Sequence, residues 1–468
     1  MQSKGVIKLL AILLAIACIY QLSFSLKARS VEKKAAEYAA KVSESDSLRQ
    51  AAEIYYLDSV QNRPVYDLGF ISFTYKEVKE KEINLGLDLK GGMNVMLEVQ
   101  VEDGKVADAW ITGGMFRGFE AILRGRNPRD ASQIVQRICG VCPTAHATAA
   151  SIALEKASGT AVPSNGRATR NLILGANYLQ SHILHFYHLA GQDFIQGPDT
   201  APFMPRYAKP DLRLPPAINA VGVDQYVEAL EVRAVCHEMV ALFGGRMPHV
   251  HGILAGGAAE IPTKEKLVEY AARFKKVRKF VEEKYLPVVY LVGSQYKDLG
   301  AFGQGYRNAL CVGVFPLDDE GKEFVFKAGA YQDGKDMPFD VKRVTEDVKY
   351  SWFADSTSGK PFTKGENVLE VDKKGAYSFV KAPLYNGKPM EVGPLARMWV
   401  NNKPISLIGQ KLFKEYFGLD VKNFRDMGED LAFSLLGRHV ARAEEALLIA
   451  NAVEGWLKEV KPDGETFT

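Results

Sequence analysis

Two cysteines separated by two residues are the part of this sequence best suited to chemistry. Cys139 and Cys142 stand in the string R-I-C-G-V-C-P-T-A-H, which ends at His146. Two thiolates at this spacing can hold one metal ion, and Gly140 between them lets the backbone bend close to it. Pro143 is typical of the first position of a helix, so His146 is expected about one turn beyond Cys142. An imidazole there can donate a hydrogen bond to a metal-bound sulfur.

The spacing alone leaves three interpretations open: a metal site, a redox-active pair and a structural pair. No βαβ pattern surrounds the two cysteines, which weighs against a thioredoxin-like redox site. No second C-x-x-C or C-x-x-H motif is present to complete a zinc site. Metal binding is therefore the favoured interpretation. The other three cysteines, Cys18, Cys236 and Cys311, have no partner at ligand spacing, and Cys236 and Cys311 are expected to be buried, unreactive thiols.

Histidines recur at short spacing in two other places. His182, His185 and His188 recur every three residues, which drifts round a helix and predicts packed, hydrogen-bonded side chains instead of a metal site. His249 and His251 alternate on a short extended segment. Neither group is assigned to a functional site.

The composition describes a globular protein and argues against nucleic-acid binding. The chain has 468 residues, of which 47% are hydrophobic. That length is enough for about three domains with a substantial core. Lys and Arg number 59 against 56 Asp and Glu, which leaves a net charge of +3. No block of basic residues with interleaved aromatic residues occurs, so no nucleic-acid partner is expected.

Residues 1–26 are expected to anchor the chain in a membrane. The stretch from Gly5 to Leu26 is mostly apolar and long enough to span a bilayer as one helix. Lys4 and Lys8 favour a cytoplasmic N-terminus and therefore the periplasmic face for the rest of the chain. The side stays open, because basic residues also follow the run: Lys27, Arg29, Lys33 and Lys34. A cleaved signal peptide is the alternative, although no clean A-x-A site follows the run. The sequence thus predicts a membrane-anchored protein.

Helical patterns dominate the sequence beyond this run. Residues 27–60 predict a polar helix, and alternating segments at Leu68–Tyr75 and Asn94–Val101 predict short strands. Long helices are expected over Cys142–Ser158, Arg167–Leu189, Gln225–Phe243, Thr263–Tyr285 and Asp430–Val460. Residues 310–388 are dense in Gly, Lys and Asp, with β-like runs at Glu323–Ala328 and Tyr377–Val380. The expected fold class is mainly α, with an α+β periphery around a helical core.

Taken as a whole, the cysteine string resembles the N-terminal cysteine motif of nickel-iron hydrogenase large subunits. The resemblance covers residues 101–468 and extends through four further segments: Asp108–Glu120 (DAWITGGMFRGFE), Arg124–Ala131 (RGRNPRDA), Leu179–Leu189 (LQSHILHFYHL) and Phe243–Gly257 (FGGRMPHVHGILAGG). It implies the helical core of a hydrogenase large subunit. It also implies reversible oxidation of dihydrogen to protons and electrons at a nickel-iron centre whose iron carries diatomic ligands. The implied partners are an iron-sulfur small subunit and the maturation proteins that install the centre.

The same resemblance implies a role for each candidate residue. Cys139 would be a terminal nickel ligand, and Cys142 would bridge nickel and iron. His146 would donate a hydrogen bond to the bridging sulfur. Glu120, in M-F-R-G-F-E, matches the magnesium-binding carboxylate of the family.

Two departures from the family pattern affect the expected activity. The family supplies two further cysteines from a D-P-C-x-x-C-x-x-H motif, and no such motif occurs in these 468 residues. The R-I-E-G-H segment, whose glutamate transfers protons in the family, is missing before Glu102. Half of the nickel ligands are thus absent from this sequence, and the chain as given is expected to be inactive. A metal-free structural relative is an alternative that the sequence leaves open.

The segment before residue 101 resembles a different family. Asn84–Val99 (NLGLDLKGGMNVMLEV), after one apolar N-terminal run, is similar to the start of SecD or SecDF, accessory subunits of the protein-export channel. We therefore interpret the chain as a chimera of a membrane helix at 1–26, a small SecD-like α/β segment at 27–100 and a truncated hydrogenase-like domain at 101–468. The alternative function is a fragment of an export-channel subunit, which would need further membrane spans that the sequence after Leu26 does not contain.

Overall fold

The computed structural model describes most of the chain after residue 94 and parts of the chain before it. The described residues are 20, 23–24, 27–42, 52, 55–57, 59–67, 72–80, 95–198, 200–201, 203–204, 211–364 and 366–468. Most of the apolar run at 5–26 and the SecD-like string at 84–94 therefore lie outside the described residues. Contacts between residues divide the chain into two units, Met1–Asn94 and Val95–Thr468.

The first unit packs a helix against a short hairpin. Residues 27–42 are helical and bury four small residues at the three- and four-residue spacing of one helix face: Ala28, Val31, Ala35 and Ala39. β1 (Pro64–Asp67) pairs antiparallel with β2 (Ser72–Thr74), and α3 (Tyr75–Glu80) follows directly. The helix expected to begin at residue 27 is thus confirmed as far as residue 42. Of the strand expected over 68–75, residues 72–74 form β2, and residues 68–71 lie outside the described residues.

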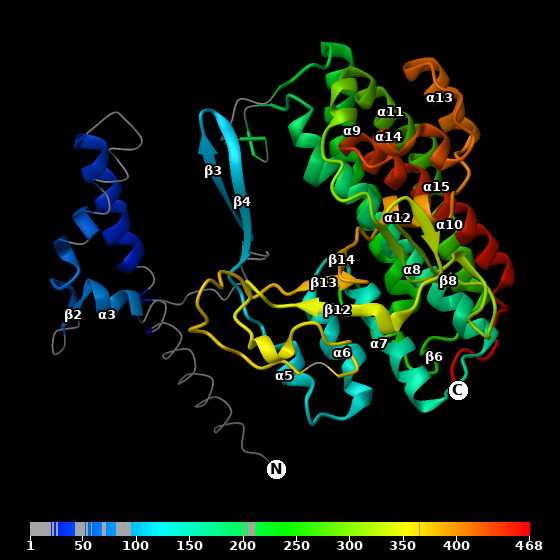
Figure 1. Cartoon of the computed structure of the whole chain (residues 1–468), viewed down its shortest axis with the longest axis horizontal. Helices are drawn as coiled ribbons and strands as arrows, with labels where there is room; N and C mark the ends of the chain where they lie inside the picture. Colours follow the sequence, from blue (N-terminus) through cyan, green and yellow to red (C-terminus); the bar gives the residue numbers. More distant parts are fainter. Residues whose placement is uncertain are drawn as a thin grey trace. The chain divides into compact units, whose positions relative to one another are not determined.

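Helices form the core of the second unit (Figure 1). In chain order the long helices are α7 (Pro143–Ser158), α8 (Ser164–Leu184), α9 (Pro216–Gly244), α10 (Lys264–Phe280), α11 (Leu286–Gln295), α13 (Leu407–Phe417) and α15 (Leu435–Glu459). α8 is central, because 16 of its 21 residues are buried and it packs against both α9 and α15. Polar side chains on α8 therefore have to find their partners inside the protein.

The predicted long helices are confirmed, with differences at their ends. α8 continues as a π-helical turn, η3 (His185–Ala190), and α10 continues as a second one, η5 (Val281–Tyr285). The helix expected over Asp430–Val460 is divided into α14 (Glu429–Ala432) and α15. The break falls at Ser434, whose hydroxyl oxygen caps α15 by accepting a hydrogen bond from the Gly437 N–H at 3.1 Å.

Short strands lie at the periphery of the helical core, as predicted (Figure 1). Two three-stranded antiparallel sheets are formed by β7 (Ala309–Cys311), β10 (Gly329–Gln332) and β11 (Lys335–Met337), and by β12 (Val344–Asp347), β13 (Ala382–Tyr385) and β14 (Lys388–Pro389). The run at 323–328 contains β9 (Phe324–Phe326), which pairs with β8 (Val314–Pro316). The run at 377–380 forms only an isolated bridge, between Ser378 and Ser351.

A long antiparallel hairpin begins the second unit. β3 (Val95–Glu102) pairs with β4 (Lys105–Gly113). Asp103 and Gly104 form the turn with positive φ angles of 49° and 73°, which the Asp-Gly sequence favours. The domain boundary expected between residues 100 and 101 falls inside β3, and the pairing of β3 with β4 joins residues 95–100 to the segment that follows them.

Close packing of α8 on α15 predicts opposite effects of a methyl group at two helical glycines. A Cβ on Gly175 would lie 2.9 Å from Val453 Cγ2 and 3.2 Å from Trp456 Cζ3. Gly175→Ala should therefore lower the free energy of unfolding by about 1–3 kcal/mol. Gly455 lies inside α15, and a Cβ added there would have no neighbouring atom within 4 Å. Gly455→Ala should therefore raise the free energy of unfolding by about 0.5–1 kcal/mol. Urea unfolding measures both changes, and equal effects would contradict this packing.

Candidate metal centre

The two predicted thiolate ligands lie where a helical turn meets α7. Cys139 directly follows the 3₁₀ turn η2 (Val135–Ile138) and is extended, with φ −140° and ψ 139°. Cys142 is the residue before α7, and Pro143 occupies the first position of that helix, as predicted. Because α7 begins there, His146 lies in its first turn, with its backbone N–H directed at the Cys142 carbonyl oxygen 3.5 Å away. The structure therefore brings Cys139, Cys142 and His146 together.

The two cysteines differ in their protonation. The Cys139 sulfur accepts hydrogen bonds from the backbone nitrogens of Val141 (3.3 Å) and Cys142 (3.2 Å). A hydrogen bond from the Cys142 thiol, these two N–H groups and nearby His146 lower the pKa of Cys139 to about 5, although partial burial opposes them. The same pairing, together with burial, raises the pKa of Cys142. At neutral pH the pair thus presents a thiolate at Cys139 and a thiol at Cys142.

Three side chains hold the loop that carries the cysteines. Asn177 and Gln180, both on α8, donate to the Val141 carbonyl oxygen at 3.2 and 3.0 Å. Arg117 donates to the carbonyl oxygen of Ile138 at 3.0 Å. The sequence reasoning missed all three residues. In the sequence, only the position of Asn177 and Gln180 within a largely apolar helical pattern indicated that these amide side chains have partners inside the protein.

Glu120, the predicted magnesium ligand, lies at the surface of the second unit. It lies in the first turn of α5 (Phe119–Leu123), and its side chain is 58% exposed. Its carboxylate lies 3.8 Å from the ammonium group of Lys381, which also contacts Glu346 at 2.8 Å. Among the residues that the structure describes, no three His, Cys, Asp or Glu side chains form a group that could hold a metal ion. Magnesium binding by Glu120 therefore stays a prediction from the sequence.

The cysteine pair can supply part of the ligand set of a metal site. The thiolate, not the thiol, binds metal ions, and Cys139 is in that form at neutral pH. The adjacent Cys142 can give up its proton when a metal ion replaces it. The pair supplies two sulfur donors, and no third donor of these types groups with them in the described part of the chain.

A buried ion cluster that the sequence reasoning missed lies near the cysteines. Glu445, on α15, has no exposed surface, and its carboxylate contacts Arg397 Nη2 at 2.8 Å and His182 Nε2 at 2.9 Å. The Arg397 guanidinium lies over the Tyr178 ring, 5.2 Å from its centre. Tyr178 stands on α8 next to Asn177, which donates to the Val141 carbonyl oxygen of the cysteine loop.

Burial and pairing act in opposite directions on the acid and the imidazole of this cluster. Burial alone would raise the pKa of Glu445, but Arg397 and His182 outweigh it and lower the pKa to about 2. Burial lowers the pKa of His182 to about 4 and outweighs the attraction of Glu445. At neutral pH, Glu445 is therefore ionised and His182 is neutral.

The other histidines of the α8 region pack against rings, as the sequence predicted. His188 Nε2 lies 3.2 Å from the Tyr226 carbonyl oxygen, and the two rings are 4.7 Å apart. The His185 ring lies 5.8 Å from that of His439.

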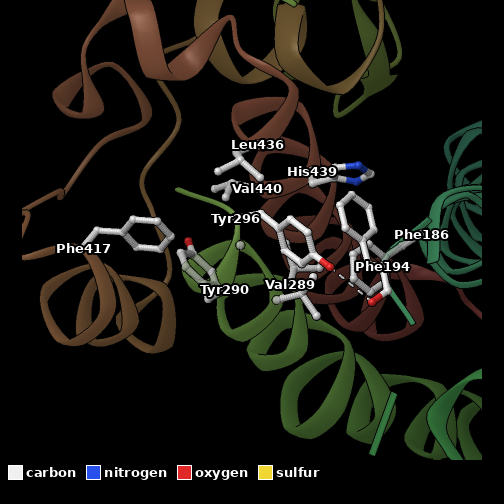
Figure 2. Close-up of a pocket in the computed structure, with 11 residues that line it drawn as sticks. Phe186, Phe194, Val289, Tyr290, Tyr296, Phe417, Leu436, His439 and Val440 are labelled. Carbon is white, nitrogen blue, oxygen red and sulfur yellow. Dashed lines mark hydrogen bonds between the residues drawn. The ribbon is translucent and has the colours of Figure 1, made fainter. Parts of the chain in front are cut away.

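An apolar pocket is lined by residues of η3, α11, α13 and α15, together with Phe194 and Tyr296. Figure 2 shows His439, Phe186 and Phe194 at one side of it, with the Tyr296 hydroxyl donating to the Phe194 carbonyl oxygen at 3.5 Å. Neither cysteine of the candidate centre lines this pocket. The pocket is therefore distinct from the candidate metal centre.

Comparison with known proteins identifies the class to which this fold and cysteine pair belong. The family model of nickel-dependent hydrogenases matches residues 117–199 and 194–467. The chain therefore belongs to the nickel-dependent hydrogenase family, and it has the fold of a hydrogenase large subunit.

Within this family the chain is similar to large subunits of the NiFeSe type. It is 59% identical over 383 residues to the periplasmic [NiFeSe] hydrogenase large subunit of Desulfomicrobium baculatum, covering 80% of this chain and 74% of that one. It matches the Ni-Fe-Se hydrogenase of D. vulgaris Hildenborough in the reduced state with a TM-score of 0.79 and 66% identity, covering 80% and 78% of the two chains. It is 31% identical to the hydrogenase-2 large chain of Escherichia coli (strain K12), covering 66% of this chain and 65% of that relative.

These results confirm one part of the sequence interpretation and correct another. The hydrogenase resemblance and the mainly helical fold are confirmed. The predicted membrane-anchored location is wrong, because the D. baculatum relative is a periplasmic protein and no helix within the described residues is long and apolar enough to cross a membrane. The helix at 27–42 carries several Lys, Arg and Glu residues, which are costly in a bilayer. The comparisons give no support to a SecD-like segment or to a chimera.

The pKa difference among the cysteines predicts which thiol reacts first with iodoacetamide. Cys139 is ionised above about pH 5, whereas burial raises the pKa of Cys236 to about 12 and raises that of Cys311 as well. At pH 7, Cys139 of the folded, metal-free chain should be alkylated at least about tenfold faster than either buried thiol. Peptide mass spectrometry after timed alkylation measures the rates. Equal protection of all three thiols would contradict an accessible thiolate at this site.

One buried and two partly buried histidines predict a loss of stability in weak acid. Burial lowers the pKa of His182, His185 and His439 to about 4, from an ordinary value of 6.5. The unfolded chain takes up protons at these residues below pH 6.5, so the stability they contribute is complete above that pH and is lost as the pH falls toward 4. His439→Phe should flatten this part of a plot of the urea midpoint against pH. The exposed His251→Phe is the control, and an unchanged slope in His439→Phe would count against burial as the cause.

Proposed function

We propose that the chain is the catalytic large subunit of a hydrogenase and that Cys139 and Cys142 are two thiolate ligands of its nickel-iron centre. The observation that carries this proposal is the Cys139 thiolate paired with Cys142 at the start of α7, in a member of the nickel-dependent hydrogenase family. When bound, a nickel-iron centre with diatomic ligands on its iron supplies the heterolytic splitting of dihydrogen. The reaction is the reversible oxidation of dihydrogen to protons and electrons.

The surroundings of each site residue support a distinct role. Cys139 can bind a metal ion without first losing a proton, which suits a terminal nickel ligand. Cys142 has to lose its proton on binding, so metal affinity should rise with pH. We assign to Cys142 the position that bridges nickel and iron. We assign to His146, one turn into α7, a hydrogen bond that holds the bridging sulfur.

We propose an iron-sulfur small subunit as the partner that receives the electrons. Five cysteines are too few for this chain to hold iron-sulfur clusters in addition to the nickel-iron centre. On α9, Val227 and Leu230 lie about one turn apart and are 55% and 48% exposed, so this helix presents two neighbouring apolar side chains at the surface. Maturation proteins that install the centre are a second class of partner. The 59% identical relative supports a periplasmic location.

A metal-free structural relative is the second candidate function. The cysteine pair provides two donors, and no third His, Cys, Asp or Glu side chain groups with them in the described residues. Metal affinity depends on completing the ligand set. We therefore propose that the 468 residues by themselves do not retain a complete nickel-iron centre.

The SecD-like character of residues 27–100 remains a separate proposal. Its support is the string Asn84–Val99 after the apolar N-terminal run, and residues 84–94 of this string lie outside the described residues.

Metal analysis of the purified chain tests these proposals. We expect substoichiometric nickel and iron, because two thiolates leave the metal ions only partly coordinated. Cys139→Ser or Cys142→Ser should lower the affinity for added nickel by about tenfold or more. Cys236→Ala is the matched control, since that thiol is buried in the helical core. Near-stoichiometric nickel and iron would contradict the incomplete site, and equal nickel affinity in all variants would contradict the assignment of the two cysteines.

A further inference from the structure

One peptide group joins the two cysteines to the buried surface of α8. Its carbonyl oxygen, on Val141, accepts hydrogen bonds from Gln180 Nε2 at 3.0 Å and Asn177 Nδ2 at 3.2 Å. Its N–H, on Cys142, donates to the Cys139 sulfur at 3.2 Å. Both lone pairs of the carbonyl oxygen and the single proton of the nitrogen are therefore engaged. The peptide is a direct hydrogen-bonded bridge from two amide side chains to a candidate metal ligand.

Contacts with α9 fix the orientation of the Gln180 side-chain amide. Gln180 has no exposed surface, and its Oε1 lies 3.4 Å from Arg233 Nε and 3.3 Å from His237 Nε2, both on α9. A guanidinium group can only donate hydrogen bonds, so the side-chain oxygen must face Arg233. The amide nitrogen consequently faces the Val141 carbonyl oxygen. The chain of contacts runs from α9 through Gln180 and the peptide to the Cys139 sulfur.

We propose that Gln180 is a positioning residue that sets how strongly the Cys139 sulfur donates electrons to a bound metal ion. Hydrogen bonds accepted by a peptide carbonyl polarise the peptide and make its N–H a stronger donor. A stronger N–H donor withdraws charge from the sulfur that accepts it, and hydrogen bonds to thiolate sulfur tune the metal that the sulfur holds. Asn177 acts on the same carbonyl oxygen in the same direction. The inference rests on the proposed function, because it concerns the same cysteines.

Cobalt(II) alone, added to the purified chain, is the probe for this effect. Gln180→Met keeps an unbranched side chain of similar length and removes the donor. We expect its sulfur-to-cobalt charge-transfer band to move to longer wavelength, because a sulfur relieved of part of its hydrogen bonding is a stronger electron donor. Cobalt affinity should fall by about tenfold, as is usual when a group that orients a metal ligand is lost. Asn177→Leu should shift the band in the same direction, and it serves as a second variant if Gln180→Met does not fold.

Asn171→Leu is the matched control, because it removes the same kind of bond from the same helix. Asn171 is buried on α8, and its Nδ2 donates to the Pro316 carbonyl oxygen at 2.9 Å, away from the cysteine loop. This variant should lose thermal stability but keep the wild-type band and affinity. A wild-type band in Gln180→Met and Asn177→Leu, with a loss of stability like that of Asn171→Leu, would overturn the proposal and leave a purely structural role.

A second measurement separates failure of this inference from failure of the proposed function. If the wild-type chain binds no cobalt at the cysteines, the proposed metal site is wrong. Amide hydrogen exchange of the metal-free chain then tests the bridge itself. Faster exchange in residues 138–146 of Gln180→Met, and not of Asn171→Leu, would support the bridge, and equal exchange in the two variants would overturn it.

Discussion

The buried carboxylate of Glu445 is the interaction on which the arrangement of the helical core depends. It joins three elements, because α15 carries Glu445, α8 carries His182 and α12 (Pro394–Val400) carries Arg397. Removing one partner of a buried ion pair leaves an uncompensated charge, which is strongly destabilising. The three helices can therefore pack only where all these partners meet. Since α8 also holds the cysteine loop through Asn177 and Gln180, the position of Glu445 bears on the geometry of the candidate metal centre.

The centre itself combines local and distant control. Local sequence sets the start of α7 through Pro143, and with it the place of His146 one turn beyond Cys142. Distant residues set the conformation of the loop, because Arg117 holds Ile138 and two α8 amides hold Val141. The thiolate at Cys139 follows from both, since its sulfur accepts N–H groups that only this loop conformation directs at it. A ligand placed in this way loses little freedom when a metal ion binds.

The features that the sequence could predict are those encoded by short-range pattern. The C-x-x-C-P string predicted the start of α7, and apolar spacing predicted the long helices of the core. Contacts between distant residues escaped prediction, because they depend on how the helices pack. Gln180 lies 39 residues from Val141 in the chain. Glu120 lies 3.8 Å from Lys381, which follows most of the helical core in the sequence. The predicted membrane-anchored location was wrong for a related reason: an apolar run has a length and a hydropathy, but these do not give the location of a protein.

The π-helical turn η3 at the end of α8 has a consequence for how this region can vary. Each residue turns a helix by about 100°, so the extra residue of a π turn changes the face presented by everything after it. Before the turn, His182 contacts Glu445 on α15, and within the turn, His188 contacts Tyr226 on α9. One continuous helix thus serves two partners on different sides. Losing a single residue between His185 and Ala190 would convert the turn to ordinary α-helix and rotate one of the two contacts out of place, so this stretch is constrained in its length more strongly than in its side chains.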